Sequence, residues 1–527
     1  MSGSVSTPSI QDLLQHSDSL VGFLERSAEA NPTTEAVSCG GSSITYGRLQ
    51  ERAEGLAGGL QEYGLTEDAR CCLALPNGIP FIESAWACAV GGIVASPINP
   101  SYRESEIAYQ LNHADAAAII TGPESVEHAQ RAIDNLDREV ALFSTAHRDG
   151  VDATIDELIE ESTQDIVDRS PSDIALQPYT SGTTGEPKGV LLSNKNFQVQ
   201  ILQTVKRRLE RDELGDALVI LPTYHITGFL LSMAALATGQ TLHLVRPDRW
   251  DPETVLEVIS SEPIIEFVGV ATMFTDLLDT YDQSRHDVES LRVTQQGGTK
   301  IPPELQTEFE NKFDVEIMEG YGMTETTAAV LSSVDASLGN RVGTAGQPTG
   351  HTRIKIVNED GDELPDGEDG ELLVKGPQVM AGYYEDTVAT EESFTDYGYF
   401  KTGDIASRDA DNYVSIKGRK KNTIISGGFN VYPAEVEDTI SSHEAIRDVI
   451  VIGVPDERKG EVVGAIVTPK EGATVNADEI KEYVLEELAP YKHPRYVEIQ
   501  QEVPRTGSGK IKRSVVEERF RDQYGSS

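Results

Sequence analysis

Short apolar strands alternate with helical patterns through much of the chain, and this alternation restricts the fold more than any other feature. Residues 43–65 carry apolar side chains at helical spacing, and the apolar run 71–75 follows them. A second helical pattern over 81–92 leads into the run 93–99, and the alternation resumes at 217–222. Strands that alternate with helices predict mostly parallel sheets covered by helices on both faces.

The last third of the chain has a different pattern. Short alternating strands over 353–357, 370–376 and 412–418 are separated by Asp and Gly turns, which predicts a small antiparallel sheet. Beyond a junction at 418–428, three strands and an amphipathic helix predict a compact α+β domain. A chain of 527 residues is too long for one ordinary core, so two or three domains are expected.

One polar stretch, Tyr179 to Asn196, has a composition suited to binding phosphate. It is YTSGTTGEPKGVLLSNKN, with hydroxyl side chains around two glycines and a closing Pro-Lys-Gly. Glycines let backbone N–H groups turn toward one point, hydroxyls add donors, and Lys188 adds a mobile positive charge. A plain polar surface loop is the alternative. The stretch differs from the GxxxxGK[ST] pattern of P-loop enzymes, because no Ser or Thr follows the lysine. We interpret it as a loop that wraps polyphosphate.

The charge balance is strongly acidic, with 87 acidic against 44 basic residues and a net charge of −43. The imbalance is spread over the whole length, and the first lysine of the chain is Lys188. A diffuse acidic surface with few lysines favours a protein that works in concentrated salt, where charges are screened over roughly 3 Å at 1 M. A merely acidic enzyme of ordinary salt is the alternative. In both cases nucleic acid and anionic membranes are not expected as partners.

The cysteines and the first residues predict a protein of the reducing cytoplasm. The spacing of the four cysteines fits no metal-binding pattern, so buried free thiols are expected at Cys39, Cys71, Cys72 and Cys88. Residues 1–20 lack the basic start and apolar run of a signal peptide. The most apolar stretch, 81–98, contains Glu83 and a proline, so it predicts a buried helix leading into a strand and no membrane span.

Four motifs occur in one order along nearly the whole chain. They are YTSGTTGEPKG (179–189), EGYGMTET (319–326), YFKTGD (399–404) with GRKK (418–421), and GSGKIKR (507–513). This set resembles the adenylate-forming superfamily, which includes acyl-CoA synthetases, aryl-CoA ligases, luciferases and the adenylation domains of peptide synthetases. The resemblance implies an adenylation domain over 1–420, with a β subdomain at about 345–417, and a mobile α+β lid domain over 421–527.

The reaction of this superfamily has two halves. A carboxylate attacks the α-phosphate of ATP, which gives an acyl-adenylate and pyrophosphate, and a thiol then displaces AMP to form a thioester. Because the first half brings two anions together, its catalysis is mostly positioning and charge neutralisation. The resemblance therefore implies ATP, Mg²⁺ and CoA as cofactor and co-substrates.

The resemblance assigns residues to the phosphate side of the site. Lys188 would close over the β- and γ-phosphates. Glu325 would bind Mg²⁺ through a carboxylate oxygen, with Thr184 as a second metal ligand, and Thr324 would bond the α-phosphate. A helix N-terminal carboxylate is the alternative for Glu325 taken alone. The backbone and hydroxyls that hold the phosphates would come from Thr180, Ser181, Gly182, Thr183, Thr184 and Gly185.

The nucleoside side is assigned in the same way. Asp404, after a Thr-Gly turn, would accept both ribose hydroxyls, and Arg419 would also reach the ribose. The residues expected around the adenine are Glu319, Gly320, Tyr321 and Gly322, with Gly298 and Thr299 on its other side.

The resemblance also implies a second arrangement of the small domain. Lys510 would bridge the α-phosphate and the attacking carboxylate, although an ordinary basic tail is the alternative. Lys421 falls at the hinge position, about which the small domain would rotate between half-reactions. That rotation would withdraw Lys510 and bring in residues 426–433. Free CoA is favoured as the thiol acceptor, because Gly427 and Gly428 would line a narrow pantetheine tunnel. The residues expected to bind CoA are Lys421, Ser426, Gly427 and Gly428.

The acyl pocket is the least determined part of the site. His225, in LPTYHITG, resembles the histidine that separates the acyl pocket from the CoA tunnel; a structural histidine at a strand end is the alternative. The chain departs from the family pattern at Thr299-Lys300, at Gly269-Val270 and at Asn422, and the first two border the adenine and acyl pockets. The candidate pocket residues are His225, Met273, Gly298, Gly322, Met323 and Ala328.

The function that follows is that of an AMP-forming acyl-CoA synthetase. A medium- or long-chain fatty acid is favoured, because ISGGFNVYPAEVE looks most like fatty-acyl ligases and no Arg or Lys is an obvious partner for a second carboxylate. An aryl acid of the coumarate or benzoate type is the close alternative. A carrier-protein-loading enzyme and a non-catalytic nucleotide-binding protein are less favoured, the latter because Glu325 and Lys510 are both present. The chain is expected as a monomer or homodimer without an integral membrane span, in the cytoplasm of a high-salt organism.

Overall fold

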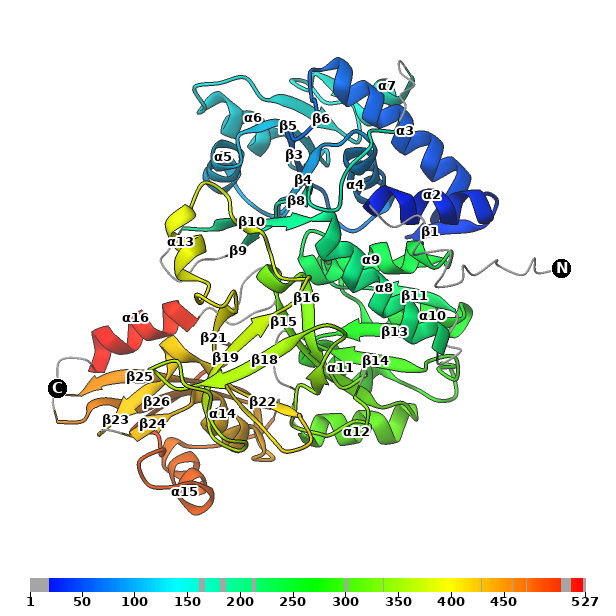
Figure 1. Ribbon diagram of the computed structural model, residues 1–527. Coiled ribbons are helices and arrows are strands. Elements are labelled where there is room, and N and C mark those ends of the chain that lie inside the picture. The colour runs from blue at the N-terminus through cyan, green and yellow to red at the C-terminus, as the bar shows by residue number, and fades with distance from the viewer. Residues whose placement is uncertain are drawn as a thin grey trace.

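The computed structural model describes residues 19–524, apart from 161–165, 181–185, 211–214, 298–300, 302, 335, 428, 457, 471 and 504–512. These residues form two large sheets, a smaller antiparallel sheet and a mixed sheet near the C-terminus (Figure 1). The predicted fold class is confirmed: mostly parallel α/β sheets, then an antiparallel β subdomain, then an α+β domain.

The first large sheet contains the strands on which most of the candidate site lies. Its order is β17-β16-β15-β14-β13-β11-β12-β1-β2. The six strands from β15 to β1 run parallel, and antiparallel strands close both edges. The strands are β1 (Glu35–Cys39), β2 (Ser42–Thr45), β11 (Asp216–Val219), β12 (Leu242–Leu244), β13 (Ile264–Gly269), β14 (Val293–Gln296), β15 (Ile317–Met323), β16 (Ala328–Ser332) and β17 (Gln347–Pro348).

The second large sheet holds the strand that follows the expected phosphate loop. Its order is β20-β10-β8-β4-β3-β5-β6-β7, with β9 paired to β10 beside this path. Strands β8 to β7 are parallel, while β10 is antiparallel to β8, β9 and β20. The strands are β3 (Arg70–Ala74), β4 (Val94–Pro97), β5 (Ala116–Thr121), β6 (Ala141–Ser144), β7 (Ala153–Thr154), β8 (Ile174–Leu176), β9 (Tyr179–Thr180), β10 (Lys188–Ser193) and β20 (Gly382–Tyr383).

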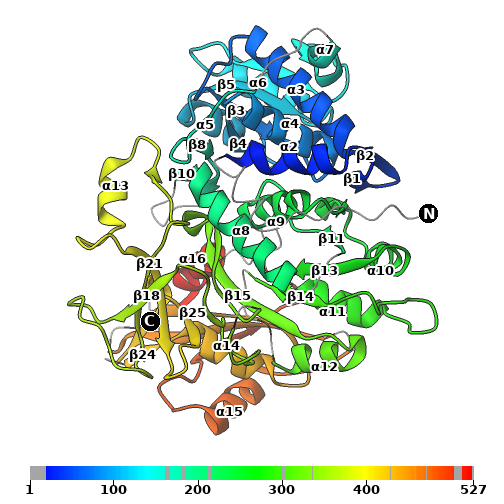
Figure 2. The ribbon, with the colours of Figure 1, turned by 45° about the vertical axis from the view of Figure 1, so that its right-hand side comes forward.

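Helices cover both large sheets, and α8 and α9 lie between them (Figures 1 and 2). Their apolar side chains share one core with strands of both sheets. The outer face of the first sheet is covered by α10, α11 and α12, and that of the second by α5 and α6. The helices are α2 (Leu20–Ala30), α3 (Tyr46–Glu62), α4 (Ile79–Val90), α5 (Glu104–His113), α6 (Val126–Asp134), α7 (Ile155–Glu160), α8 (Asn194–Glu210), α9 (Ile226–Ala237), α10 (Pro252–Ser261), α11 (Ala271–Thr280) and α12 (Pro303–Phe313), with the 3₁₀ turn η1 (Pro247–Arg249).

The composition of α9 suits a helix that is packed between two sheets. Nearly all of its side chains are apolar and buried, which is typical of a helix enclosed on every side. Gly228 in its first turn allows a close approach to the preceding segment, since a Cβ there would lie 2.2 Å from the carbonyl oxygen of Pro222. The helix is therefore fixed against the end of β11, where the expected site begins.

The third and fourth sheets match the two patterns of the last third of the chain. The antiparallel sheet has the order β18-β19-β21-β22, and the C-terminal sheet has β24-β23-β26-β25 with β27 paired to β26. Helices α14, α15 and α16 pack on the C-terminal sheet. The elements are β18 (Arg353–Val357), β19 (Gly370–Lys375), β21 (Phe400–Arg408), β22 (Val414–Arg419), β23 (Ile424–Ser426), β24 (Phe429–Val431), β25 (Ile446–Asp456), β26 (Gly460–Pro469), β27 (Tyr496–Ile499), α13 (Thr387–Glu392), α14 (Pro433–Ser441), α15 (Ala477–Glu487), α16 (Arg513–Tyr524), η2 (Thr324–Thr326) and η3 (Lys420–Asn422).

One local prediction was wrong, and it concerns a segment that bears site residues. Asp404 was expected after a turn, but it lies inside β21, directly opposite Arg419 on β22. Gly403, with a φ of +69°, is the residue that lets this strand pass through the left-handed region. The glycine-rich segment after residue 319 continues β15 to Met323, because β16 pairs with it.

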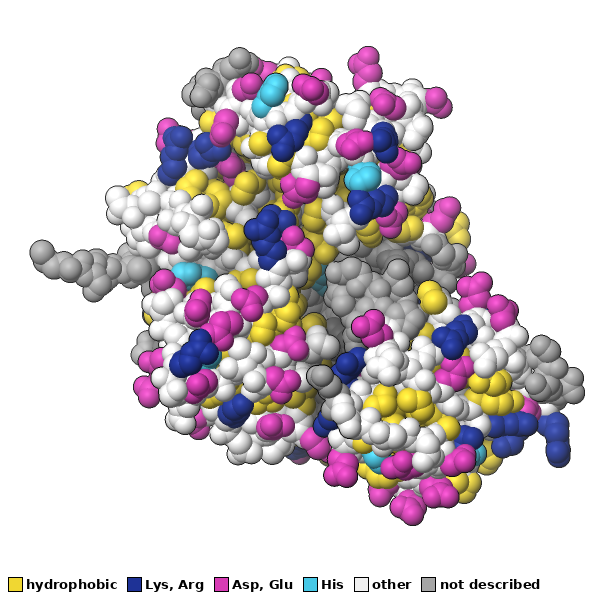
Figure 3. Space-filling model, turned by 180° about the vertical axis from the view of Figure 1, so that it is seen from behind, with side chains coloured by type: hydrophobic (Ala, Val, Ile, Leu, Met, Phe, Trp, Pro, Cys, Tyr) yellow, Lys and Arg dark blue, Asp and Glu magenta, His cyan; other side chains and the backbone are white. Residues whose placement is uncertain are grey.

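The cysteine and charge predictions can be checked directly. All four cysteines are free; Cys71, Cys72 and Cys88 are buried and Cys39 is half-buried. Acidic side chains are scattered over the visible face in Figure 3 and do not gather in one patch. Within the part of the chain that the structure describes, no helix has both the length and the apolar character needed to span a membrane.

Candidate active site

Glu325 lies in a short turn of unusual backbone conformation that joins β15 to β16. The turn is η2, and the two residues after it, Thr327 and Ala328, have φ values of +50° and +72°. Such values are uncommon for residues other than glycine, and strained residues tend to gather at functional sites. Gly322 on the opposing strand fits this turn closely, since a Cβ there would lie 1.8 Å from the carbonyl oxygen of Ala328.

Helix α8 holds this turn and the segment 377–379 through two amide side chains one helical turn apart. The Gln200 amide donates to the carbonyl oxygens of Thr326, Thr327 and Ala329, at 3.3, 2.8 and 2.8 Å. The Asn196 amide donates to two carbonyl oxygens of the segment 377–379. Gln200 was not among the residues predicted from sequence. Its i, i+4 spacing from Asn196, at the end of the polar stretch, was the available signal.

The Glu325 carboxylate is almost fully buried and has a tyrosine as its side-chain partner. The hydroxyl of Tyr383, on β20, donates to Glu325 Oε1 at 3.1 Å. Burial raises the pKa of Glu325, against the lowering effect of its hydrogen bonds and of Arg419. Burial, and then the charge of Glu325, raise the pKa of Tyr383, so this tyrosine stays a donor. Tyr383 was not among the predicted residues, because nothing in its sequence segment signals the pairing of β20 with β10.

Asp404 is held by two partners that the sequence had assigned to the nucleoside. It is 4% exposed. Its Oδ2 accepts from the hydroxyl of Tyr321 at 2.5 Å, and its Oδ1 lies 3.0 Å from Nε of Arg419. Burial raises the pKa of Asp404, while Arg419 and the bond from Tyr321 lower it. The expected ribose-binding group is thus already assembled from β15, β21 and β22.

Lys188 sits at the start of β10, where the expected phosphate loop ends. It pairs across the antiparallel β9–β10 ladder with Thr180, the residue that precedes the undescribed part of the predicted loop. The Lys188 ammonium lies 3.5 Å from Asp386 Oδ2 and 5.1 Å from the centre of the Tyr383 ring. Tyr383 therefore contacts both Lys188 and Glu325. The predicted loop residues Ser181, Gly182, Thr183, Thr184 and Gly185 lie outside the described residues.

His225 follows the carboxyl end of β11 and begins α9 as its N-cap. Its Nδ1 accepts from the backbone N–H of Thr227 at 3.3 Å, so that nitrogen carries no proton. The preceding segment is fixed by buried Asn77, whose oxygen accepts from the N–H of Thr223 at 2.7 Å. The Asn77 amide also donates to the carbonyl oxygens of Leu221 and Val245. Asn77, another residue missed from sequence, joins the two large sheets beside His225.

The remaining predicted residues divide into three groups. Glu319, Gly320, Tyr321, Gly322 and Met323 share β15, with Thr324 next to them in η2, while Met273 lies near the start of α11 and Ala328 on β16. Lys421 lies in η3 between β22 and β23, Ser426 ends β23, and Gly427 follows it. Among the described residues, no hydrogen bond or ion pair joins these three to Glu325 or Asp404. Lys510, Gly298, Thr299 and Gly428 lie outside the described residues.

The buried carboxylates of the described site suit a hard cation. Glu325 and Asp404 are both buried, and each lies close enough to Arg419 for its charge to lower their pKa values. One guanidinium facing two carboxylates leaves a negative charge in a poorly solvated place, which a divalent cation would neutralise. The Glu325 oxygens accept from neutral donors, the hydroxyl of Tyr383 among them, and Mg²⁺ prefers such oxygen ligands. The residues present therefore fit Mg²⁺.

Comparison with known families and proteins gives long matches. A family model described as AMP-binding enzyme matches residues 24–384, and one described as AMP-binding enzyme C-terminal domain matches 435–510. A feruloyl-CoA synthase of an Amycolatopsis species is 34% identical over 497 residues, which cover 94% of this chain and 98% of that protein. A long-chain-fatty-acid–CoA ligase of Bacillus subtilis is 30% identical and covers 96% and 95%.

Solved structures of the same architecture also match nearly the whole chain. MatB of Rhodopseudomonas palustris bound to ATP has a TM-score of 0.87 and 28% identity, and covers 96% of this chain and 99% of that one. The o-succinylbenzoate CoA synthetase of Bacillus subtilis with its acyl-adenylate has a TM-score of 0.81 and 27% identity, and covers 94% and 97%.

Proposed function

The chain belongs to the AMP-binding enzyme family and is an acid–thiol ligase of the AMP-forming acyl-CoA synthetase type, and on this premise we propose that it activates an apolar monocarboxylic acid. A medium- or long-chain fatty acid is the favoured substrate. The observation that carries the proposal is the cluster of Glu325, Asp404 and Arg419, with Lys188 linked to it through Tyr383.

In the first half-reaction, a carboxylate oxygen of the acid attacks the α-phosphorus of ATP. The bond to the β-phosphate oxygen breaks, and pyrophosphate leaves with both electrons of that bond. Asp404 and Arg419 would orient the ribose, and Lys188 would hold the departing phosphates. Because attacking group and phosphate are both anionic, this positioning lowers the barrier chiefly by neutralising charge and fixing geometry.

A bound Mg²⁺ would neutralise the phosphate charge. In this chain Glu325 would hold the ion, and Thr184 is proposed as a second ligand. Tyr383 would fix the Glu325 carboxylate by its hydrogen bond and shield it from water. In the second half-reaction a CoA thiolate attacks the acyl carbon, and AMP leaves with the C–O electrons.

The preference for an apolar acid follows from the charges around the candidate acyl pocket. The described pocket positions are His225, Met273, Gly322, Met323 and Ala328, and none of them is a lysine or an arginine. A second carboxylate or a sulfonate on the substrate would need a cationic partner when buried. The pocket positions offer apolar contacts instead, which suits an alkyl chain.

An aryl acid is the second candidate, and a specific observation favours it. Among the similar proteins, the one at 34% identity is named a feruloyl-CoA synthase. In addition, the close contact with Ala328 already accounts for a glycine at position 322. The lack of a side chain there is therefore no evidence of room for a long acyl chain. The shape of the pocket, and not its charge, separates these two substrate classes.

Pyrophosphate release tests the proposal. The purified enzyme would be supplied with Mg·ATP and a panel of saturated fatty acids, coumarate, ferulate, benzoate and dicarboxylates, with and without CoA. We expect release with monocarboxylates and CoA-dependent formation of AMP and thioester. Turnover confined to dicarboxylates would contradict the charge argument, and no turnover with any fatty or aryl acid would contradict the proposed substrate class.

Lys510 and the rotation of the small domain form a separate part of the proposal. We expect Lys510→Ala to abolish adenylate formation but to spare thioester formation from supplied acyl-adenylate, because the lysine would serve only the first half-reaction. Lys421→Pro, at the proposed hinge, is expected to impair the second half-reaction. Equal loss of both half-reactions in Lys510→Ala would contradict the rotation.

We also propose that the enzyme works in concentrated salt. Its net charge of −43 is dispersed, so self-repulsion is strongest in dilute buffer and is screened as salt rises. The melting temperature is expected to increase steadily from dilute buffer to molar NaCl. A melting temperature independent of salt would contradict this proposal without affecting the enzymatic one.

A further inference from the structure

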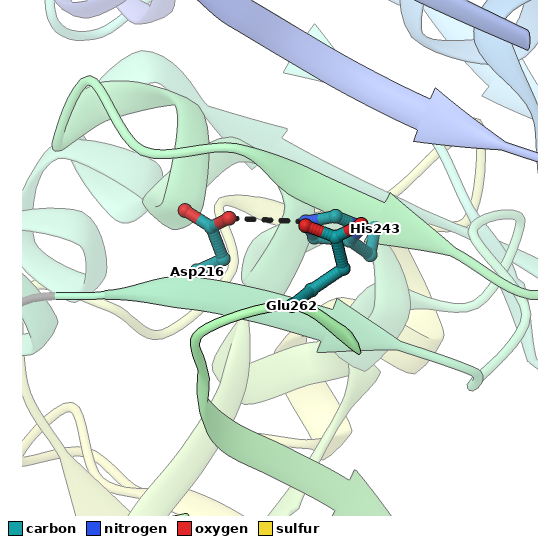
Figure 4. A group of neighbouring side chains, drawn as sticks. All are labelled: Asp216, His243 and Glu262. Carbon is teal, nitrogen blue, oxygen red and sulfur yellow. Dashed lines mark hydrogen bonds and ion pairs between the residues drawn. The ribbon is translucent and has the colours of Figure 1, made fainter. Parts of the chain in front are cut away.

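Three metal-ligating side chains meet at the end of the first sheet opposite the candidate active site. Asp216 begins β11, His243 is central in β12, and Glu262 ends α10 just before β13. The strands are parallel neighbours in the order β12-β11-β13, so their amino-terminal ends share one edge. Figure 4 shows the three side chains pointing toward one another.

Two hydrogen bonds already fix the position of the Asp216 carboxylate within the group. One ligand atom from each residue lies within 4.8 Å of the other two. His243 Nε2 lies 3.1 Å from Asp216 Oδ2, and the other Asp216 oxygen accepts from the backbone N–H of Thr241 at 3.2 Å. That backbone bond fixes the carboxylate so that its remaining oxygen faces the imidazole.

Glu262 completes the group from a different element. It is exposed, and its carboxylate forms no hydrogen bond or ion pair with any other residue in the described ranges. Its backbone is held, since its N–H donates to the carbonyl of Val258 and its own carbonyl accepts from the N–H of Ile264 at 2.7 Å. A carboxylate on a fixed backbone, with a free side chain, can close onto an ion beside His243 and Asp216.

We propose that Asp216, His243 and Glu262 bind a divalent transition-metal ion such as Zn²⁺. At metal–ligand distances of roughly 2.0–2.2 Å, two ligands of one ion lie roughly 3.0–3.6 Å apart. The imidazole–carboxylate separation already falls in this range, so the ion replaces the proton between them with little movement. One imidazole nitrogen and two carboxylate oxygens are ligands that Zn²⁺ accepts, and water would fill the remaining position.

Other histidine–carboxylate pairs of the molecule lack these features. His286 lies 3.4 Å from Glu253 Oε1, but Arg285 is ion-paired to that same oxygen. His443 lies 3.6 Å from Glu479, and no third such side chain of the described residues lies close enough to share an ion with them. Among the described residues, the Asp216–His243–Glu262 group is the one set of three such side chains close enough to hold an ion. His286 therefore supplies a matched control.

The position of the group indicates a structural ion. Substrates of open α/β sheets bind beyond the carboxyl ends of the strands, and this group lies beyond their amino ends. An ion there joins β11, β12 and the α10–β13 connection, which are separate segments of chain. It is therefore expected to stabilise the fold and to leave the chemistry of the opposite edge unchanged.

Zinc binding to the full-length protein tests this proposal. The protein would be stripped with a chelator, dialysed against ZnCl₂ with excess Mg²⁺ and molar NaCl to suppress loose carboxylate binding, and analysed for metal content and melting temperature. We expect one tightly held Zn²⁺ per chain and a higher melting temperature. Glu262→Gln, an exposed and nearly isosteric change, is expected to weaken Zn²⁺ affinity by at least about tenfold.

Two further variants distinguish Zn²⁺ bound at this site from Zn²⁺ bound loosely by the acidic surface. Asp216→Asn is expected to remove the bound Zn²⁺, whereas His286→Gln is expected to retain it. Equal Zn²⁺ binding by Glu262→Gln, Asp216→Asn and the unmodified protein would overturn the proposal, as would a failure of the unmodified protein to retain Zn²⁺. The test measures metal content and melting temperature and does not use pyrophosphate release, so its result is independent of the acyl substrate.

Discussion

The two ends of the first sheet carry similar side chains in opposite environments. At the carboxyl end, Glu325 and Asp404 are 9% and 4% exposed and receive bonds from tyrosine hydroxyls. At the amino end, the Asp216 side chain is 17% exposed and Glu262 is exposed. Burial of a carboxylate costs stability unless a cation is supplied. Because the buried carboxylates of the carboxyl end need a cation, we expect that end to bind charged substrates. We expect the more exposed amino end to stabilise the fold.

The largest expected effect is a difference in activity between the same substitution made at each end of the sheet. Glu325→Gln removes the carboxylate proposed to hold Mg²⁺, so kcat for pyrophosphate release is expected to fall by about 10²-fold or more, as when one transition-state contact is lost. Glu262→Gln makes the same chemical change at the amino end and is expected to retain full activity at saturating Mg·ATP. Steady-state kinetics across a range of Mg²⁺ concentrations provide the measurement.

Either of two results would break this comparison. An unchanged kcat in Glu325→Gln would remove that residue from the site. A comparable loss in Glu262→Gln, with the melting temperature unchanged, would mean that the amino end takes part in the reaction.

The next effect concerns the strained turn that presents Glu325. In Gly322→Ala the new Cβ would meet the carbonyl of Ala328 at 1.8 Å, so backbone must shift and the free energy of unfolding is expected to fall by about 1–3 kcal/mol. Gly320→Ala, on the same strand, is the matched control, because its Cβ would lie at an ordinary 3.4 Å from the carbonyl of Leu331. Thermal unfolding of both variants measures the difference; equal melting temperatures would show that the turn yields easily.

The sequence predicted much of this carboxyl end but not how it is held together. Periodicity and turn residues were enough for the sheets, and the family resemblance carried by the four motifs brought Glu325, Asp404 and Arg419 into one expected site. The supports were missed. Gln200 binds three carbonyl oxygens, and its i, i+4 spacing from Asn196 is its one trace in the sequence. Tyr383 lies on a strand of two residues, which leaves neither a period nor a motif.

The amino end could not be predicted from sequence for a different reason. Asp216, His243 and Glu262 are far apart in the chain, and their spacing follows no metal-binding pattern. They meet because parallel strands β11, β12 and β13 become neighbours, which is a property of strand order. Sequence periodicity predicts that strands exist, but the order in which they pair depends on the packing of the whole domain.

Tyr383→Phe is expected to have a smaller effect on activity than Glu325→Gln. The change removes the hydroxyl that donates to Glu325 but keeps the ring near Lys188. A hydrogen bond to a charged group contributes at least roughly 1.5 kcal/mol, the equivalent of about tenfold, so a loss of about tenfold in kcat is expected, with a higher Mg²⁺ requirement. Tyr384→Phe, on the next residue, is the control. A lower affinity for ATP without any change in Mg²⁺ dependence would point to a role through Lys188 instead.

The smallest expected effect tests the cost of burial at the carboxyl end through pH. Because burial raises the pKa of Glu325, the folded state favours the protonated form. Stability associated with that form is fully present below the ordinary carboxyl range and is lost as pH rises through the raised pKa. Glutamine mimics the protonated acid, so Glu325→Gln is expected to match the unmodified protein at low pH and to melt at a higher temperature near neutral pH.

Asp404→Asn is expected to show no such gain, since it deprives Arg419 of its ion-pair partner. Melting curves from acidic to neutral pH measure both differences, and a lower melting temperature of Glu325→Gln at neutral pH would show that Glu325 stabilises the fold.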